Sequence, residues 1–196
     1  IHYIYTSLTA NHPNNTGSAM NMQAEQMDIQ PQSAAGIDPN TMSIIVTKGS
    51  LDWAYPPLIL GSTAAAMGLE VTMFFTFYGL SLLKKDLNLQ VTPLGNAAME
   101  MPMAGGHMTM PNIVGMLPGV DAMASKMMKN LIKKNGVASV EELRELSVEA
   151  DVRMIACQMT LELFDYKKED LIDGIEIGGA ATYIECATKS HINLFI

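Results

Sequence analysis

The sequence contains few cysteines and few basic residues. Two cysteines in 196 residues, Cys157 and Cys186, are too few for a disulfide framework, and neither has the CxxC spacing of a zinc or thioredoxin-type site. Reduced thiols in the cytoplasm are therefore the expected state. Twelve Lys and Arg against twenty Asp and Glu give a formal net charge of −8. This balance disfavours a nucleic-acid partner, because such binding depends on neutralising phosphates.

One long run is almost free of charge. Residues 54–83 contain Glu70 as their only charged residue, and the run is long enough for a membrane span. Prolines and glycines interrupt it, however, and its hydrophobic period changes midway. We therefore predict a helix followed by a buried strand, and no membrane span. A secretory signal is not expected either, because the first 41 residues contain no Lys or Arg.

The composition changes near residue 40. Residues 1–40 are rich in Asn, Gln, Ser, Thr and Pro, and we expect an N-terminal extension that is weakly structured or packs on a neighbour. Residues 41–196 alternate between short apolar runs and helical patterns. The expected strands are 42–47, 70–77, 152–156, 175–179 and 192–196, and the main expected helices are 52–67, 79–85, 120–135, 139–150 and 180–189. This order predicts a three-layer α/β domain with a mostly parallel sheet, helices on both faces and a flavodoxin-like arrangement.

Cys157 is the candidate functional residue, because it directly follows the predicted strand 152–156. Open α/β sheets bind ligands outside the carboxyl ends of their strands. Backbone N–H groups at the start of a following helix favour a thiolate over a thiol. The alternative is a small, inert and partly buried packing residue, and spacing alone favours this alternative slightly.

Accessory candidates lie after the first predicted strand, at the same edge of the sheet as Cys157. Lys48 is a candidate to stabilise a thiolate or an anion, and Asp52 is a candidate helix cap. The turn at Gly49 resembles a phosphate-binding turn only weakly, because neither a GxGxxG nor a Walker pattern is present. No organic cofactor is therefore expected. Gln158, the residue after Cys157, completes the accessory set.

A long connection rich in Gly, Pro and Met spans residues 88–120, and such loops usually have a function or are mobile. Within it, residues 99–111 combine His107 with five methionines: Met99, Met101, Met103, Met108 and Met110. Thioether and imidazole groups suit Cu(I), so soft-metal handling with an incidental thiol is a rival hypothesis. The simpler interpretation is an apolar lid over the thiol or against another subunit, without a resident metal. His107 is also a candidate proton shuttle for Cys157.

The second thiol, Cys186, lies in the predicted helix 180–189 on the same face as Tyr183, and we expect it to be buried. A disulfide between Cys186 and Cys157 is a less favoured alternative. A thiol peroxidase is a further alternative. It would place a threonine or proline and an arginine beside the cysteine, and Arg153 lies four residues before Cys157 on the predicted strand.

Four segments in order resemble the DsrE/DsrF-like family of sulfur carriers, in its larger DsrE-type branch. They are GSLD (49–52), MFFTFYGL (73–80), LIDGIEIGGAATY (171–183) and LFI (194–196), with IACQMT (155–160) between the second and third. The order of these segments over roughly 155 residues is harder to match by chance than any one of them. The resemblance maps the family's sulfur-binding cysteine onto Cys157.

The resemblance implies a function. Members of the family carry sulfane sulfur as a cysteine persulfide and exchange it with rhodanese-like and TusA-like proteins. It implies that the Cys157 thiolate attacks a donor, that a persulfide forms, and that an acceptor thiolate takes the outer sulfur. The protein would be at most a sulfurtransferase. The resemblance also implies a homo-oligomer, which the apolar loop 93–118 would fit.

Overall fold

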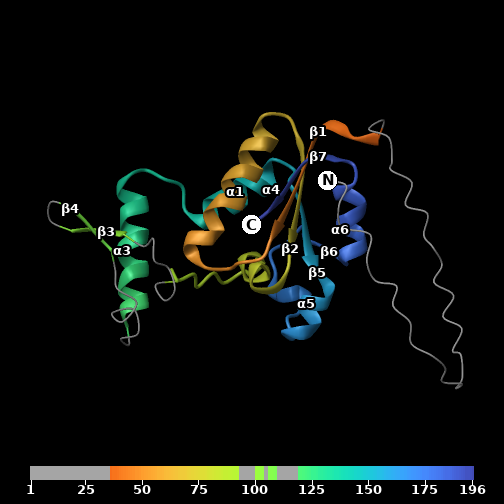
Figure 1. Ribbon diagram of the computed structural model, residues 1–196. Helices are drawn as coiled ribbons and strands as arrows, with labels where there is room; N and C mark the ends of the chain where they lie inside the picture. The colour runs from red at the N-terminus through yellow and green to blue at the C-terminus, as the bar shows by residue number, and fades with distance from the viewer. Residues whose placement is uncertain (1–35, 93–99, 104–105, 110–118) are drawn as a thin grey trace, which may run out of the picture. The chain divides into compact units, whose positions relative to one another are not determined.

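The computed structural model describes residues 36–92, 100–103, 106–109 and 119–196, with side chains described outside residues 93–118. Its central feature is a sheet of five parallel strands in the order β6-β5-β2-β1-β7 (Figure 1). These strands are β1 (Asp38–Val46), β2 (Glu70–Phe75), β5 (Arg153–Cys157), β6 (Glu176–Gly178) and β7 (Ser190–Phe195).

The central strands are apolar on both faces, as a parallel sheet covered on both sides requires. Ile44, Met73 and Met154 are in register across β1, β2 and β5 and are at most 2% exposed. This row packs against one layer of helices. On the other face, Phe74 and Ile155 pack with Tyr183.

Helices cover both faces of the sheet. Helices α1 (Leu51–Ala66) and α4 (Val140–Glu149) cover one face, and α6 (Ala180–Ala187) lies on the other (Figure 1). Helix α4 begins with the predicted capping box, in which Ser139 Oγ accepts the Glu142 N–H and the Glu142 carboxylate accepts the Ser139 N–H. The predicted three-layer α/β class with a parallel sheet is confirmed.

The remaining elements connect these layers. They are the 3₁₀ segments η2 (Phe77–Leu83) and η3 (Lys168–Asp170), the helices α3 (Val120–Lys134) and α5 (Gln158–Leu163), and the strands β3 (Glu100–Met103) and β4 (Gly106–Thr109). β3 and β4 pair antiparallel, where we expected only a loop. Pro102 lies inside β3, and a proline within a run normally argues against a strand.

The charge-poor run 54–83 divides as predicted. Helix α1 continues through Pro56 and Pro57, and the buried strand β2 follows. Within the described part of the chain, no helix is both long enough and apolar enough for a membrane span. The first strand begins at Asp38, four residues earlier than the expected strand. Residues 1–35 lie outside the described part, so the N-terminal extension stays a prediction.

Candidate functional site

Two loops with interlocking backbones build the carboxyl edge of the sheet. Gly49, after β1, approaches the carbonyl group of Tyr78, and Gly79 in η2 approaches the carbonyl group of Val46. A Cβ atom at either glycine would overlap these backbone atoms, so both positions require glycine. The Gly79 N–H also donates to the Thr47 carbonyl oxygen at 3.0 Å. The turn at Gly49 therefore serves close backbone packing, which holds η2 against the end of β1.

Cys157 ends β5 at this same edge, and its side chain is only 5% exposed. It packs with Phe74 and Tyr183 on the α6 face of the sheet. Because β5 lies beside β2, the residues that follow the two strands meet. The hydroxyl oxygens of Thr76 and Thr160, 84 positions apart in the sequence, lie 3.2 Å from each other.

These two hydroxyls are among the groups that change the pKa of Cys157. Burial alone raises the pKa of Cys157, but hydrogen bonds from the Thr160 hydroxyl, the Thr160 N–H, the Thr76 hydroxyl and the Met159 N–H lower it. The net pKa lies below the ordinary value of 9.0. The site therefore favours a thiolate, although Cys157 is a buried residue.

Phe77 connects this site to the interlocked loops. Its backbone has a φ of 47°, which is unusual for a bulky residue, and its N–H donates to Thr160 Oγ1 at 3.1 Å. Thr160 is fully buried. Phe77 and three further apolar side chains of η2 and α5 are exposed: Tyr78, Met159 and Leu163. The buried sulfur is thus flanked by segments that present apolar side chains to the outside.

Two predicted accessory residues make other contacts. The Lys48 ammonium lies 3.1 Å from the centre of the Trp53 ring, and it is not among the groups that shift the pKa of Cys157. The exposed Gln158 side chain donates to Glu162 at 3.0 Å. The structure therefore does not bring Lys48 or the Gln158 amide into the hydrogen-bonding set of the sulfur.

The structure describes the surroundings of Asp52, the predicted helix cap, but not the side chain of His107. Ser50 occupies the N-cap position of α1, so the capping role expected for Asp52 is wrong. Asp52 lies in the first turn, and its buried Oδ1 has no hydrogen-bond partner among the described residues. His107 lies on β4, but its side chain and the methionines of residues 99–111 fall outside the described side chains. In the described part, no group of three or more His, Cys, Asp or Glu is placed to hold a metal ion.

Sequence reasoning missed Thr76 and Thr160. Thr160 follows the predicted strand 152–156, and Thr76 lies near the end of the predicted strand 70–77. Their place at an edge where ligands bind was the available signal. Their meeting depends on β5 lying beside β2, and the order of strands cannot be read from either segment alone.

The sequence profile of the DsrE/DsrF/DrsH-like family matches residues 38–195. The chain belongs to this family. A relative named sulfur carrier protein DsrE2, from Allochromatium vinosum, is 60% identical over 155 residues, which cover 79% of this chain and 97% of that protein. The uncharacterized protein YrkE of Bacillus subtilis is 33% identical over 162 residues, covering 79% and 95%. The crystal structure of the ychN protein from E. coli matches with a TM-score of 0.46 and 12% identity, covering 80% of this chain and 99% of that chain.

The second thiol of this DsrE/DsrF/DrsH-like protein lies near the amino ends of the strands. Cys186 is half-buried, whereas we expected it to be buried, and both thiols are free. Arg153, the first residue of β5, donates to Cys186 Sγ at 2.9 Å and forms two hydrogen bonds with the Glu176 carboxylate. Arg153 and Cys186 line a pocket of about 600 Å³. The arginine beside Cys157 that a peroxidase would need is therefore not supplied by Arg153.

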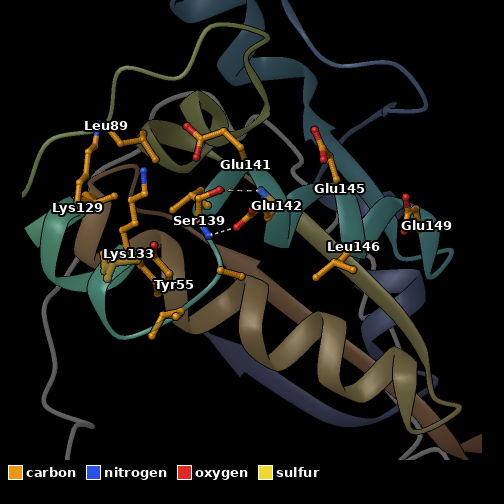
Figure 2. A pocket seen from close by; sticks show the side chains of 16 residues that line it. Tyr55, Leu89, Lys129, Lys133, Ser139, Glu141, Glu142, Glu145, Leu146 and Glu149 are labelled. Atoms are coloured by element: carbon orange, nitrogen blue, oxygen red, sulfur yellow. Dashed lines mark hydrogen bonds between the residues drawn. The ribbon is translucent and has the colours of Figure 1, made fainter.

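A separate groove of about 800 Å³ lies between α1, α3 and α4 (Figure 2). Lys129 and Lys133 line it from α3, and acidic residues of α4 including Glu141 line it from the other helix. Burial, followed by the charges of Glu141 and Glu142, raises the pKa of Tyr55 at this groove. None of the three helices carries Cys157, so the groove is distinct from the thiol site.

Proposed function

We propose that this family member is a sulfur carrier that holds sulfane sulfur as a persulfide on Cys157 and passes it to an acceptor thiol. The observation that carries the proposal is the position of Cys157 at the carboxyl end of β5, where uncharged neighbouring groups lower its pKa although burial raises it. The 60% identical relative named a sulfur carrier supports the same role. The family resemblance of residues 155–160 supports the choice of Cys157.

The proposed reaction has two balanced steps. In the first, the Cys157 thiolate attacks the sulfane sulfur of a donor, and the donor leaves as a thiolate or another stable anion. In the second, an acceptor thiolate attacks the outer sulfur of the persulfide. The bond between the two sulfurs breaks, and its electron pair returns to Cys157 as the thiolate. Neither step requires a cofactor.

The proposed partners are sulfur donor and acceptor proteins of the rhodanese-like and TusA-like kinds in the cytoplasm. Their chemistry follows from the reaction, because each must bring a sulfur atom to Cys157. We also propose a homo-oligomer. The apolar loop 93–118, which we expected at such a contact, lies largely outside the described residues, and its side chains are entirely outside them.

Loading of sulfur tests the proposal directly. The protein is incubated with glutathione persulfide or polysulfide, and its intact mass is measured before and after treatment with a reductant. We expect wild type to gain the mass of sulfur in a form that the reductant removes. Cys157→Ser should gain none, whereas the matched variant Cys186→Ser should load as wild type does. A Cys157→Ser protein that still loads reducible sulfur contradicts the proposal.

A further inference from the structure

The groove between α1, α3 and α4 has two walls of opposite charge. Lys129 and Lys133 line it from α3, and Glu145 and Glu149 line it from α4. Figure 2 shows the two lysines on one side of the groove and these two glutamates on the other. All four residues are exposed. Among the described residues, the three ion pairs lie elsewhere and none crosses the groove, so neither wall neutralises the other.

The stability of α4 does not account for its row of acidic residues. Acidic side chains stabilise the first turn of a helix, where Glu141 and Glu142 lie. Glu149, however, is the last residue of α4, and a carboxylate there opposes the helix dipole. Glu145 lies four residues before Glu149, so two like charges are neighbours on one face of the helix. A favourable contact outside the helix would offset these costs.

The complement of this acidic row lies in the same chain. Of the twelve basic residues, four belong to the 15-residue helix α3: Lys126, Lys129, Lys133 and Lys134. The two lysines in the groove are four residues apart, as are Glu145 and Glu149. Each pair therefore spans about 6 Å along its helix axis. Two rows of equal spacing and opposite charge match when their helices lie side by side.

Apolar side chains line the same groove. Leu146 of α4 and Val137, which follows α3, are 48% and 46% exposed, and the half-buried Ile132 contributes from α3. Protein–protein interfaces combine an apolar centre with a polar rim. The groove therefore has the composition of a contact with another protein.

We propose that a second copy of this chain covers the groove, with α3 of each copy lying along α4 of the other. The lysine row of one copy then faces the glutamate row of the other, and a two-fold axis repeats the contact. A second copy supplies both rows, whereas a partner of a single charge would be repelled by one wall. The inference rests on the proposed homo-oligomer and assigns its interface, and the sulfur chemistry does not enter it.

Reversal of each charged row tests this interface. One double variant, Lys129→Glu/Lys133→Glu, reverses the row of α3. A second, Glu145→Lys/Glu149→Lys, reverses the row of α4. The mass of the full chain in solution is measured by light scattering over a range of protein concentrations, for each protein alone and for an equal mixture of the two variants.

We expect wild type to form an oligomer. Each double variant alone should need at least about tenfold more protein to reach the same mass, because attraction between the rows becomes repulsion. The mixture should associate within about threefold of the wild-type concentration. In the mixed dimer, one contact pairs the two reversed rows and the other pairs the two unchanged rows.

A matched variant controls for net charge. Lys167→Glu/Lys168→Glu changes two exposed lysines that do not line the groove, and it alters the net charge as much as the α3 variant does. This control should associate as wild type does. Dissociation of the control to the same extent as the α3 variant would overturn the interface, because net charge alone would then explain the effect.

The other outcomes separate the interface from the homo-oligomer. A wild type that stays monomeric at every concentration overturns both proposals. A wild-type oligomer that neither charge reversal weakens overturns only the interface, and so does a loss of association that mixing the two variants does not restore.

Folding of each variant is checked by thermal melting. If a charge reversal does not fold, the neutral variants Lys129→Gln/Lys133→Gln and Glu145→Gln/Glu149→Gln decide. Each should weaken association by about threefold or more, because the attraction between the rows is lost without new repulsion. Association equal to that of wild type in these neutral variants overturns the interface.

Discussion

The two thiols of this protein lie near opposite ends of the same strand. Cys157 ends β5 and is 5% exposed, and its pKa is lowered although burial raises it. Cys186 is half-buried and contacts Arg153, where β5 begins. In the sequence, the place of Cys157 at a strand end made it the candidate thiol, and the structure places the arginine beside the other thiol. The pKa of Cys157 is nevertheless lowered, by uncharged groups and although burial raises it.

The two thiols differ because different hydrogen-bond donors lie at the two ends of β5. At the amino end, the Arg153 guanidinium already forms two hydrogen bonds with the Glu176 carboxylate. At the carboxyl end, β5 turns into α5, and the first N–H groups of a helix have no partner within that helix. At this end, uncharged N–H and hydroxyl groups, among them the Thr76 hydroxyl, lower the pKa of Cys157 although burial raises it.

The largest effect is expected from Gly79→Ala, which tests whether the interlocked loops build the carboxyl end. The new methyl group would overlap the Val46 carbonyl, so η2 must shift. We expect unfolding in denaturant to require about 2 to 4 kcal/mol less free energy than in wild type. The midpoint of Cys157 alkylation should also move to higher pH, because the shift of η2 displaces Thr76.

A matched glycine provides the control for that variant. Gly179 precedes α6 with a φ of −98°, and an added Cβ would meet no atom within 4 Å. Gly179→Ala should therefore change the free energy of unfolding by less than about 1 kcal/mol. Equal stabilities of the two variants would contradict the role assigned to Gly79.

The sequence was sufficient for most of the fold. Apolar runs and turn residues located the five strands of the sheet, and the Ser139 capping box located the start of α4. It was insufficient where a residue's role depends on a distant segment. Gly49 looked like a possible ligand turn, yet its role depends on the Tyr78 backbone. The hydroxyl pair at Cys157 was not predicted for the same reason, since strand order brings it together.

A smaller effect is expected from Arg153→Gln, which tests whether the two ends are independent. The side chains of Arg153 and Glu176 are each 44% exposed, so solvent screens the pair, and its loss should cost less than about 1 kcal/mol. The alkylation rate of Cys157 should be unchanged. Slower alkylation in this variant would show that the two ends of β5 are coupled and would contradict their independence.

The same pair has a defined pH dependence. The hydrogen bond from Arg153 lowers the pKa of Glu176 below its ordinary value of 4.5. The resulting stability is present above pH 4.5 and is lost as the pH falls through the lowered pKa. The difference in melting temperature between wild type and Arg153→Gln should therefore shrink in acid. A difference that grows below pH 4.5 would contradict this assignment.

The most direct test of the central claim is the pH profile of Cys157 alkylation in the folded protein, read by peptide mass after brief exposure to iodoacetamide. We expect Cys157 to react without unfolding, with a midpoint below the ordinary thiol pKa of 9.0. Modification that occurs only in denaturant, or a midpoint at or above 9.0, would contradict a reachable and stabilised thiolate.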